Sequence, residues 1–120
     1  MKPIEDTMPA EMQEVVQKLR RFAKDRDWDQ FHTPGNLAKS IVIEASELMT
    51  DFQWEDPTHY TGYKERAEEE IADIFIYMLM FCDTLGIDPV VAANAKIELN
   101  AKRYPVAKCK GNCLKAGRDF

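Results

Sequence analysis

The chain has 120 residues, of which 45% are hydrophobic and 31% are charged, and its formal net charge at pH 7 is −5. This balance is typical of one globular domain and excludes a disordered chain, which would carry fewer apolar residues. The negative charge argues against a nucleic-acid polymer as the partner, because a nucleic-acid groove needs a basic surface.

Targeting and redox signals are weak in this sequence. No apolar stretch follows the first lysine, so no signal peptide is expected, and the longest apolar run, Ile74–Cys82, is far shorter than the roughly 20 residues that span a membrane. The three cysteines, Cys82, Cys109 and Cys113, form no C-x-x-C pair. We therefore expect a reduced, cytoplasmic protein without a membrane partner.

Apolar spacing predicts an all-α fold of four helices. The first helix is expected from about Pro9 to Lys24, capped by Thr7, with its apolar stripe formed by Met12, Val15, Val16, Leu19 and Phe22. A polar, aromatic link follows and is punctuated by Pro34 and Gly35. The second helix is expected from about Asn36 to Phe52.

The third helix is predicted from about Tyr63 to Leu85, because Gly86 suits the left-handed residue that follows a helix. Asp88-Pro89 is typical of an N-cap followed by the first helical residue, so the fourth helix is predicted from Pro89 to Arg103. It ends at Tyr104-Pro105, because the residue before a proline avoids the helical region.

We expect a domain over residues 1–105 and a C-terminal tail over residues 106–120 that is partly disordered. Within the third helix, Ile74–Cys82 is apolar on every side, and such a helix must be covered on every side. Three neighbouring helices of one subunit would not suffice. The sequence therefore predicts a bundle in which helices of neighbouring subunits pack together in a homo-oligomer.

Two acidic pairs, Glu44/Glu47 and Glu70/Asp73, occupy consecutive predicted helices at i, i+3 spacing, which puts both members of each pair on one helix face. Glu44 borders the apolar stripe of its helix, and Glu70 and Asp73 flank an apolar residue in the same way. Asp51, farther along the second helix, would support them.

Four carboxylates directed into one space repel each other unless they take up protons or bind a cation. Mg²⁺, or alternatively Mn²⁺, would relieve the repulsion, because such ions prefer oxygen ligands and share their coordination with substrate phosphates. The alternative is a pair of solvated acidic helix faces, which is the commoner origin of a single E-x-x-E pattern.

Further segments accompany the acidic motif: RDWDQFH before the second helix, FQW after it, EEIADIFIY in the third helix, and K-x-x-x-N-x-x-R-Y-P at the end of the fourth. With these segments, the chain from about Leu19 to Pro105 resembles the MazG-like all-α nucleotide pyrophosphohydrolases, and within them the dCTP pyrophosphatase group. The resemblance carries Glu44, Glu47, Glu70 and Asp73 over as metal ligands and catalytic residues.

The resemblance implies Mg²⁺-dependent hydrolysis of a nucleoside triphosphate to the monophosphate and pyrophosphate. It implies a site built across subunits, usually in a tetramer that is a dimer of dimers. The favoured substrate is dCTP, and dATP and dUTP stay open as neighbouring alternatives.

Lys96, Asn100 and Arg103 share one face of the fourth helix, and their side chains suit phosphate oxygens. An exposed polar face is the alternative, and the resemblance favours phosphate binding by Lys96 and Asn100. For Arg103, the alternative is that the Arg-Tyr-Pro segment mainly ends the helix.

Aromatic residues are candidates for binding the base and the sugar. Trp28 and Trp54, in the two links that flank the second helix, would stack on the base, or else cover the core. His32 would donate a hydrogen bond to the substrate. Tyr77 lies one turn beyond Asp73, beside the sugar or simply in the core.

Three rival functions compete with this prediction. A di-iron bundle is strongly disfavoured, because neither His32 nor His59 has a glutamate three residues before it. Phosphoribosyl-ATP pyrophosphohydrolase shares the acidic helices but would not call for two base-stacking tryptophans. A non-catalytic, partner-binding helical dimer would show no dependence on Mg²⁺.

Overall fold

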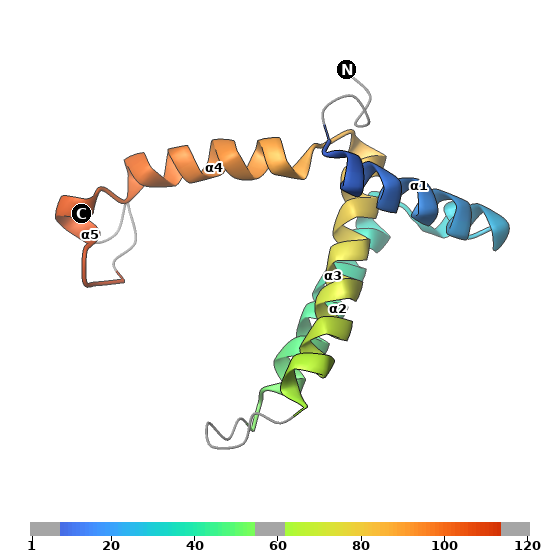
Figure 1. The fold of residues 1–120 in the computed structure, drawn as a ribbon, viewed down its shortest axis with the longest axis horizontal. Helices are drawn as coiled ribbons and strands as arrows, with labels where there is room; N and C mark the ends of the chain where they lie inside the picture. The colour runs from blue at the N-terminus through green and yellow to red at the C-terminus, as the bar shows by residue number, and fades with distance from the viewer. Residues whose placement is uncertain (1–7, 55–61, 114–120) are drawn as a thin grey trace. The chain divides into compact units, whose positions relative to one another are not determined.

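The structure is a computed structural model and describes residues 8–54 and 62–113. Within these ranges it is all-helical, as the sequence predicts. The helices are α1 (Ala10–Asp25), η2 (Asp29–Phe31, a 3-10 turn), α2 (Pro34–Asp51), α3 (Tyr63–Leu85), α4 (Pro89–Arg103) and α5 (Val106–Cys109) (Figure 1). The chain divides into two compact units, Met1–Ile87 and Asp88–Phe120.

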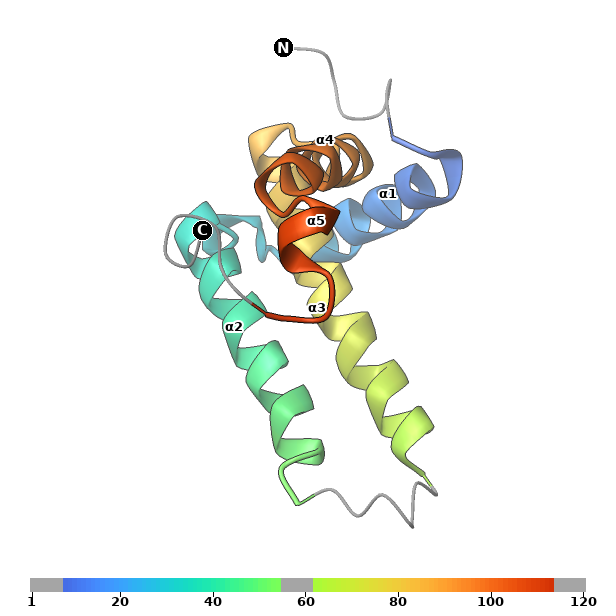
Figure 2. The same cartoon turned by 90° about the vertical axis from the view of Figure 1, so that its left-hand side faces the viewer.

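In the first unit, α2 and α3 lie side by side in opposite directions and form the most extensive helix pair, and α1 packs against α3 (Figure 2). The buried core cluster joins α1 and α3 through Val16, Leu79 and Cys82, together with Met8. Leu37 at the start of α2 is also fully buried. This small core depends on a few large side chains.

The link between α1 and α2 turns the chain back over the end of α1. Asp27 adopts a left-handed conformation with φ 55°, and the Trp28 N–H donates to the Ala23 carbonyl at 2.9 Å. The 3-10 turn η2 follows. The expected start of α2 at Asn36 is two residues late, because Thr33 caps the helix by accepting from the Asn36 N–H at 3.2 Å and Pro34 is its first residue.

The predicted bounds of α3 and α4 are confirmed. Gly86 ends α3 in the left-handed conformation, with φ 69°, and the Ile87 N–H donates a hydrogen bond to the Cys82 carbonyl at 2.8 Å. In the second unit, Asp88 Oδ1 accepts from the Val90 N–H at 2.9 Å and caps α4.

Within the expected tail, residues 106–109 form the helical turn α5, and residues 114–120 lie outside the described ranges, so the expectation of partial disorder stays a prediction. Pro105 precedes this turn and its carbonyl accepts from the Cys109 N–H, which satisfies the backbone locally. The predicted Thr7 cap and most of the expected loop after Trp54 also lie outside the described residues.

Apolar side chains remain exposed on the outer faces of the α2–α3 pair. Val42 and Met49 are each 67% exposed and Ile71 is 53% exposed. Along the apolar run of α3, only Leu79 and Cys82 are fully buried. No single helix of the described chain is long and apolar enough to cross a membrane; α3 and α4 meet that criterion only as a bent pair, by length and composition alone.

We expect Leu79→Ala to lower the free energy of unfolding by about 2–5 kcal/mol, because it opens a cavity in a core with few members. Leu85→Ala on the same helix, at a side chain that is 41% exposed, should cost markedly less. Urea denaturation of both variants measures the difference. Equal losses would contradict this description of the core.

Candidate functional site

Three carboxyl groups converge between α2 and α3. One carboxylate oxygen from each of Glu44, Glu47 and Glu70 lies within 4.8 Å of the others. Glu44 and Glu47 occupy successive turns of α2, and Glu70 faces them from the N-terminal half of α3. We call these three residues the acidic cluster.

Partial burial makes the acidic cluster electrostatically costly. Glu44 and Glu70 are half-buried, and the Oε2 atom of each is buried without a hydrogen-bond partner among the described residues. Burial raises the pKa of Glu44 above its ordinary value of 4.5, and the hydrogen bond to Glu47 and the nearby charges of Glu47, Asp73 and Glu70 raise it further. The Glu44 carboxyl therefore holds its proton more tightly than a free carboxyl does.

The pKa of Glu70 is raised by the same kinds of interaction. Burial raises its pKa most, followed by the charges of Glu47 and Asp51, a hydrogen bond with Glu47, and the charge of Asp73. Asp51 thus lies close enough to act on the cluster, as its place on α2 suggests. Asp73 is exposed and lies outside the group of three, but its charge reaches both Glu44 and Glu70.

The chemistry of the acidic cluster fits a hard divalent cation. Its ligand atoms are all carboxylate oxygens, the type that Mg²⁺ and Mn²⁺ prefer, and Glu44 and Glu70 each have a buried Oε2 without a hydrogen-bond partner among the described residues. A cation would replace the missing partners and reverse the repulsion that raises the two pKa values. The residues present therefore fit the ion that the sequence predicts.

A cavity of about 270 Å³ is lined by three of the predicted substrate-binding residues. Trp28, His32 and Tyr77 all line it, and Asp73 does so as well. We call it the aromatic cavity. Asp73 links the two features, because it lines this cavity and its charge also reaches Glu44 and Glu70.

The remaining walls of the aromatic cavity are apolar and consist of Leu19, Phe22, Ile76 and Met80. Sequence reasoning missed these residues as parts of a site, since Leu19 and Phe22 belong to the apolar stripe of α1 and read as core. The signal that would have distinguished Phe22 is its place in the last two turns before the aromatic link. Its side chain is 47% exposed.

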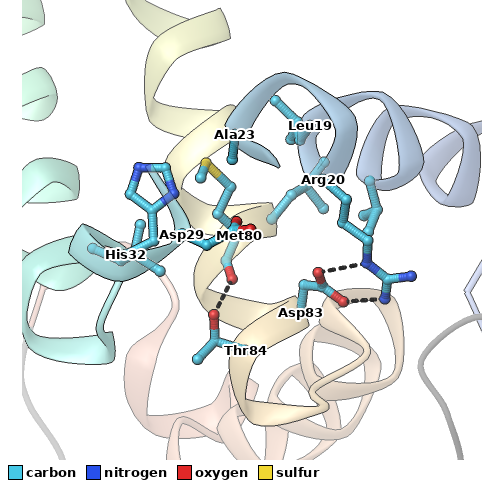
Figure 3. A pocket seen from close by; sticks show the side chains of 11 residues that line it. Leu19, Arg20, Ala23, Asp29, His32, Met80, Asp83 and Thr84 are labelled. Atoms are coloured by element: carbon cyan, nitrogen blue, oxygen red, sulfur yellow. Dashed lines mark hydrogen bonds and ion pairs between the residues drawn. The ribbon is translucent and has the colours of Figure 1, made fainter. Parts of the chain in front are cut away.

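A second cavity, of about 170 Å³, shares His32, Leu19 and Met80 with the aromatic cavity and lies between α1, the link and α3 (Figure 3). Arg20 and Asp83 close one side of it through a two-pronged ion pair, with Arg20 Nε donating to Asp83 Oδ2 at 2.9 Å. This pair ties α1 to α3. It holds the helices that carry the walls of both cavities.

Four further predicted substrate-binding residues belong to other parts of the chain. Trp54 lies just beyond the end of α2, with its side chain 85% exposed, and lines neither cavity. Lys96, Asn100 and Arg103 belong to α4 in the second unit, where Lys96 and Arg103 are exposed and Asn100 is half-buried. α4 ends at Arg103, where the sequence predicts the end of the fourth helix.

Comparison with known proteins gives the site a context. Residues 39–117 match the model of the MazG-like family. The chain is 36% identical to dCTP pyrophosphatase 1 of Mus musculus, 37% to that of Bos taurus and 33% to that of Homo sapiens. These matches cover 84% of this chain but only 65–66% of the relatives, so the chain spans less than two thirds of their length.

A solved structure is also similar. A pyrophosphatase from Archaeoglobus fulgidus is 41% identical, and the superposition covers 81% of this chain and 94% of that chain with a TM-score of 0.74. The likeness therefore includes both the sequence and the fold.

The raised pKa values predict an unusual dependence of stability on pH. In metal-free buffer, the stability that protonated Glu44 contributes is present below the ordinary carboxyl value of 4.5 and is lost as the pH rises through the raised pKa. Glu44→Gln should therefore melt at a higher temperature than the wild type at neutral pH, and the gap should close in acid. Mg²⁺ should stabilise the wild type more than the variant.

The control for this experiment is Glu69→Gln, at an exposed position of α3 outside the acidic cluster. It should follow the wild type across the whole pH range. Thermal melting curves that also coincide for Glu44→Gln and the wild type would show that the cluster carries no electrostatic strain.

Proposed function

We propose that this chain, which belongs to the MazG-like family, is a nucleoside triphosphate pyrophosphohydrolase that releases the nucleoside monophosphate and pyrophosphate. The proposal rests on the acidic cluster, whose carboxylate oxygens can hold a cation, and on the aromatic cavity, which Asp73, one turn along α3 from Glu70, lines together with Trp28 and Tyr77. The relatives named as pyrophosphatases support the same reaction.

The proposed cofactor is Mg²⁺, with Mn²⁺ as the alternative. Glu44, Glu47 and Glu70 would hold one ion or two, with Asp73 completing the set from the side of the cavity. When bound, the ion supplies neutralisation of the triphosphate and a polarised water.

The carboxylates of the acidic cluster have different roles in the proposed reaction. In the proposed reaction a water oxygen forms a bond to the α-phosphorus, and the bond from that phosphorus to the bridging oxygen of pyrophosphate breaks. Glu47 is the exposed member of the acidic cluster, so its carboxylate is the one that an attacking water reaches, and it accepts the proton of that water. Glu44 and Glu70 sit deeper and act as ligands.

The aromatic cavity would hold the nucleoside. Trp28 would stack on the base, His32 would donate a hydrogen bond, and Tyr77 would pack beside the sugar, one turn from Asp73. The names of the mammalian relatives support dCTP as the substrate. Stacking discriminates poorly among bases, so dUTP and dATP are the competitors to compare.

On α4, we propose that Lys96, Asn100 and Arg103 bind phosphate oxygens. Their i, i+4, i+7 spacing puts an ammonium, an amide and a guanidinium on one helix face, and these are suitable donors for a polyphosphate.

The reaction and its base can be tested together. With Mg²⁺ and dCTP, the wild type should release dCMP and pyrophosphate in equal amounts, and a chelator should abolish the release. Glu47→Gln should lower kcat by about 10²–10⁴-fold, because it removes the proton acceptor. Glu69→Gln, outside the cluster, should leave kcat unchanged.

Product analysis by chromatography separates the alternatives. Orthophosphate in place of pyrophosphate would mean that the bond assignment is wrong. A preference for dUTP or dATP in the same panel would keep the reaction and change the substrate. No hydrolysis of any triphosphate with Mg²⁺ or Mn²⁺ would leave the partner-binding dimer as the better reading.

We further propose that the site is completed in a homo-oligomer, a tetramer built as a dimer of dimers. The apolar side chains exposed on α2 and α3, including Val42, Ile43 and Ile71, need a cover that the described residues of one chain do not supply. Trp54 lies at the opposite end of α2 from Trp28. A neighbouring subunit would bring it to the base.

Light scattering coupled to size exclusion should give the mass of a tetramer for the wild type. The double substitution Val42→Asp and Met49→Asp puts two charges on an exposed apolar face of α2, and should yield smaller species. Gln17→Asp on the exposed side of α1 is the control and should keep the wild-type mass. A monomeric wild type would contradict the proposal.

A further inference from the structure

Three side chains at the end of α1 form a continuous stack. The guanidinium carbon of Arg26 lies 3.5 Å from the centroid of the Phe22 ring. The Phe22 ring in turn meets the ring of Trp28 edge to face, with centroids 5.8 Å apart and an interplanar angle of 68°. Phe22 and Trp28 both line the aromatic cavity, and Arg26 does not.

The backbone gives this stack a fixed frame. Arg26 Nη1 donates to the Phe22 carbonyl at 3.1 Å, which holds the guanidinium over the ring one turn back. The left-handed Asp27 then reverses the chain, and the hydrogen bond from the Trp28 N–H to Ala23 brings the Trp28 ring back beside Phe22. Local hydrogen bonds therefore assemble all three side chains without help from the core.

Exposure shows why the stack matters. Phe22 is 47% and Trp28 45% exposed, so neither ring is immobilised by burial. A half-exposed ring in a link has several accessible rotamers, and ordering it on binding would weaken affinity. The Trp28 ring instead contacts Phe22, which itself lies under the Arg26 guanidinium.

We propose that Phe22 and Arg26 are positioning residues that pre-organise Trp28 for stacking on the nucleobase. This inference rests on the proposed function, in which Trp28 binds the base. Neither residue takes part in the chemical step. Their loss should therefore raise KM and leave kcat unchanged, whereas a loss of the carboxylates acts on kcat.

The first part of the test needs no nucleotide. The sequence has two tryptophans, so Trp54→Phe leaves Trp28 as the sole tryptophan, and excitation at the red edge of indole absorption avoids the four tyrosines. In that background, Arg26→Ala and Phe22→Leu should lower the steady-state anisotropy of Trp28 and increase its quenching by acrylamide. Arg21→Ala, at an exposed neighbouring position of α1, is the matched control and should change neither signal. Unchanged Trp28 fluorescence in both variants would overturn the proposal.

The second part uses the chain with Trp54 intact and dCTP with Mg²⁺. Arg26→Ala should raise KM about two- to fivefold at constant kcat, as expected for losing one exposed cation–π contact. Arg26→Lys should fall between, since an ammonium keeps the charge but lacks the planar face. A fall in kcat with unchanged KM would overturn the positioning role.

The two parts also separate this inference from the function on which it rests. If the wild type hydrolyses no triphosphate, the proposed function fails, and the fluorescence of Trp28 still decides whether the stack orders its ring. If hydrolysis proceeds and Arg26→Ala matches the wild type in both KM and Trp28 anisotropy, only the positioning role fails. Circular dichroism melting of each variant confirms that the compared proteins are folded.

Discussion

The repulsion among carboxyl groups held between α2 and α3 is the constraint on which the site depends. The α2–α3 pair brings Glu44, Glu47 and Glu70 within 4.8 Å of each other and buries an oxygen of two of them, so that burial and neighbouring charge both raise the pKa of Glu44 and Glu70. A fold under selection for stability alone would place apolar side chains there. The arrangement is therefore best understood as one that a cation stabilises, at a cost to the cation-free chain.

The aromatic cavity depends on a different set of interactions. Its walls include Asp73 and Tyr77, one turn apart on α3, and residues of the link that folds back after α1. The ion pair of Arg20 with Asp83 joins the two helices that supply most of its walls. The acidic cluster would supply the chemistry, and the α1–α3 contact would supply the place where a base can lie.

How much of this was predictable from the sequence differs between elements. The bounds of α3 and α4 were correct because Gly86 and the Asp88-Pro89 pair are strong local signals. The predicted start of α2 is two residues late, because Thr33-Pro34 is compatible with a loop and equally with an N-cap followed by the first helical residue. Elements as short as η2 and α5 carry no periodicity. Helix-face geometry predicts that all four carboxylates meet; the structure groups Glu44, Glu47 and Glu70, and Asp73 lies outside that group. The participation of Phe22 in a cavity wall depends on the chain reversal at Asp27, which residue spacing does not predict. Whether α4 and Trp54 serve this cavity or another subunit's depends on assembly, which residue spacing within one chain does not encode.

If a cation replaces protons on the carboxyl groups of the acidic cluster, Mg²⁺ binding releases those protons, and their number can be measured directly. Calorimetric titration of the wild type with Mg²⁺, in buffers of equal pH but different ionisation enthalpy, counts the protons released per ion bound. We expect Mg²⁺ binding to release protons in weakly acidic buffer and to release none in alkaline buffer. The Glu44→Gln variant should release fewer protons than the wild type. Binding of Mg²⁺ without proton release at any pH, or no binding at all, would contradict this expectation.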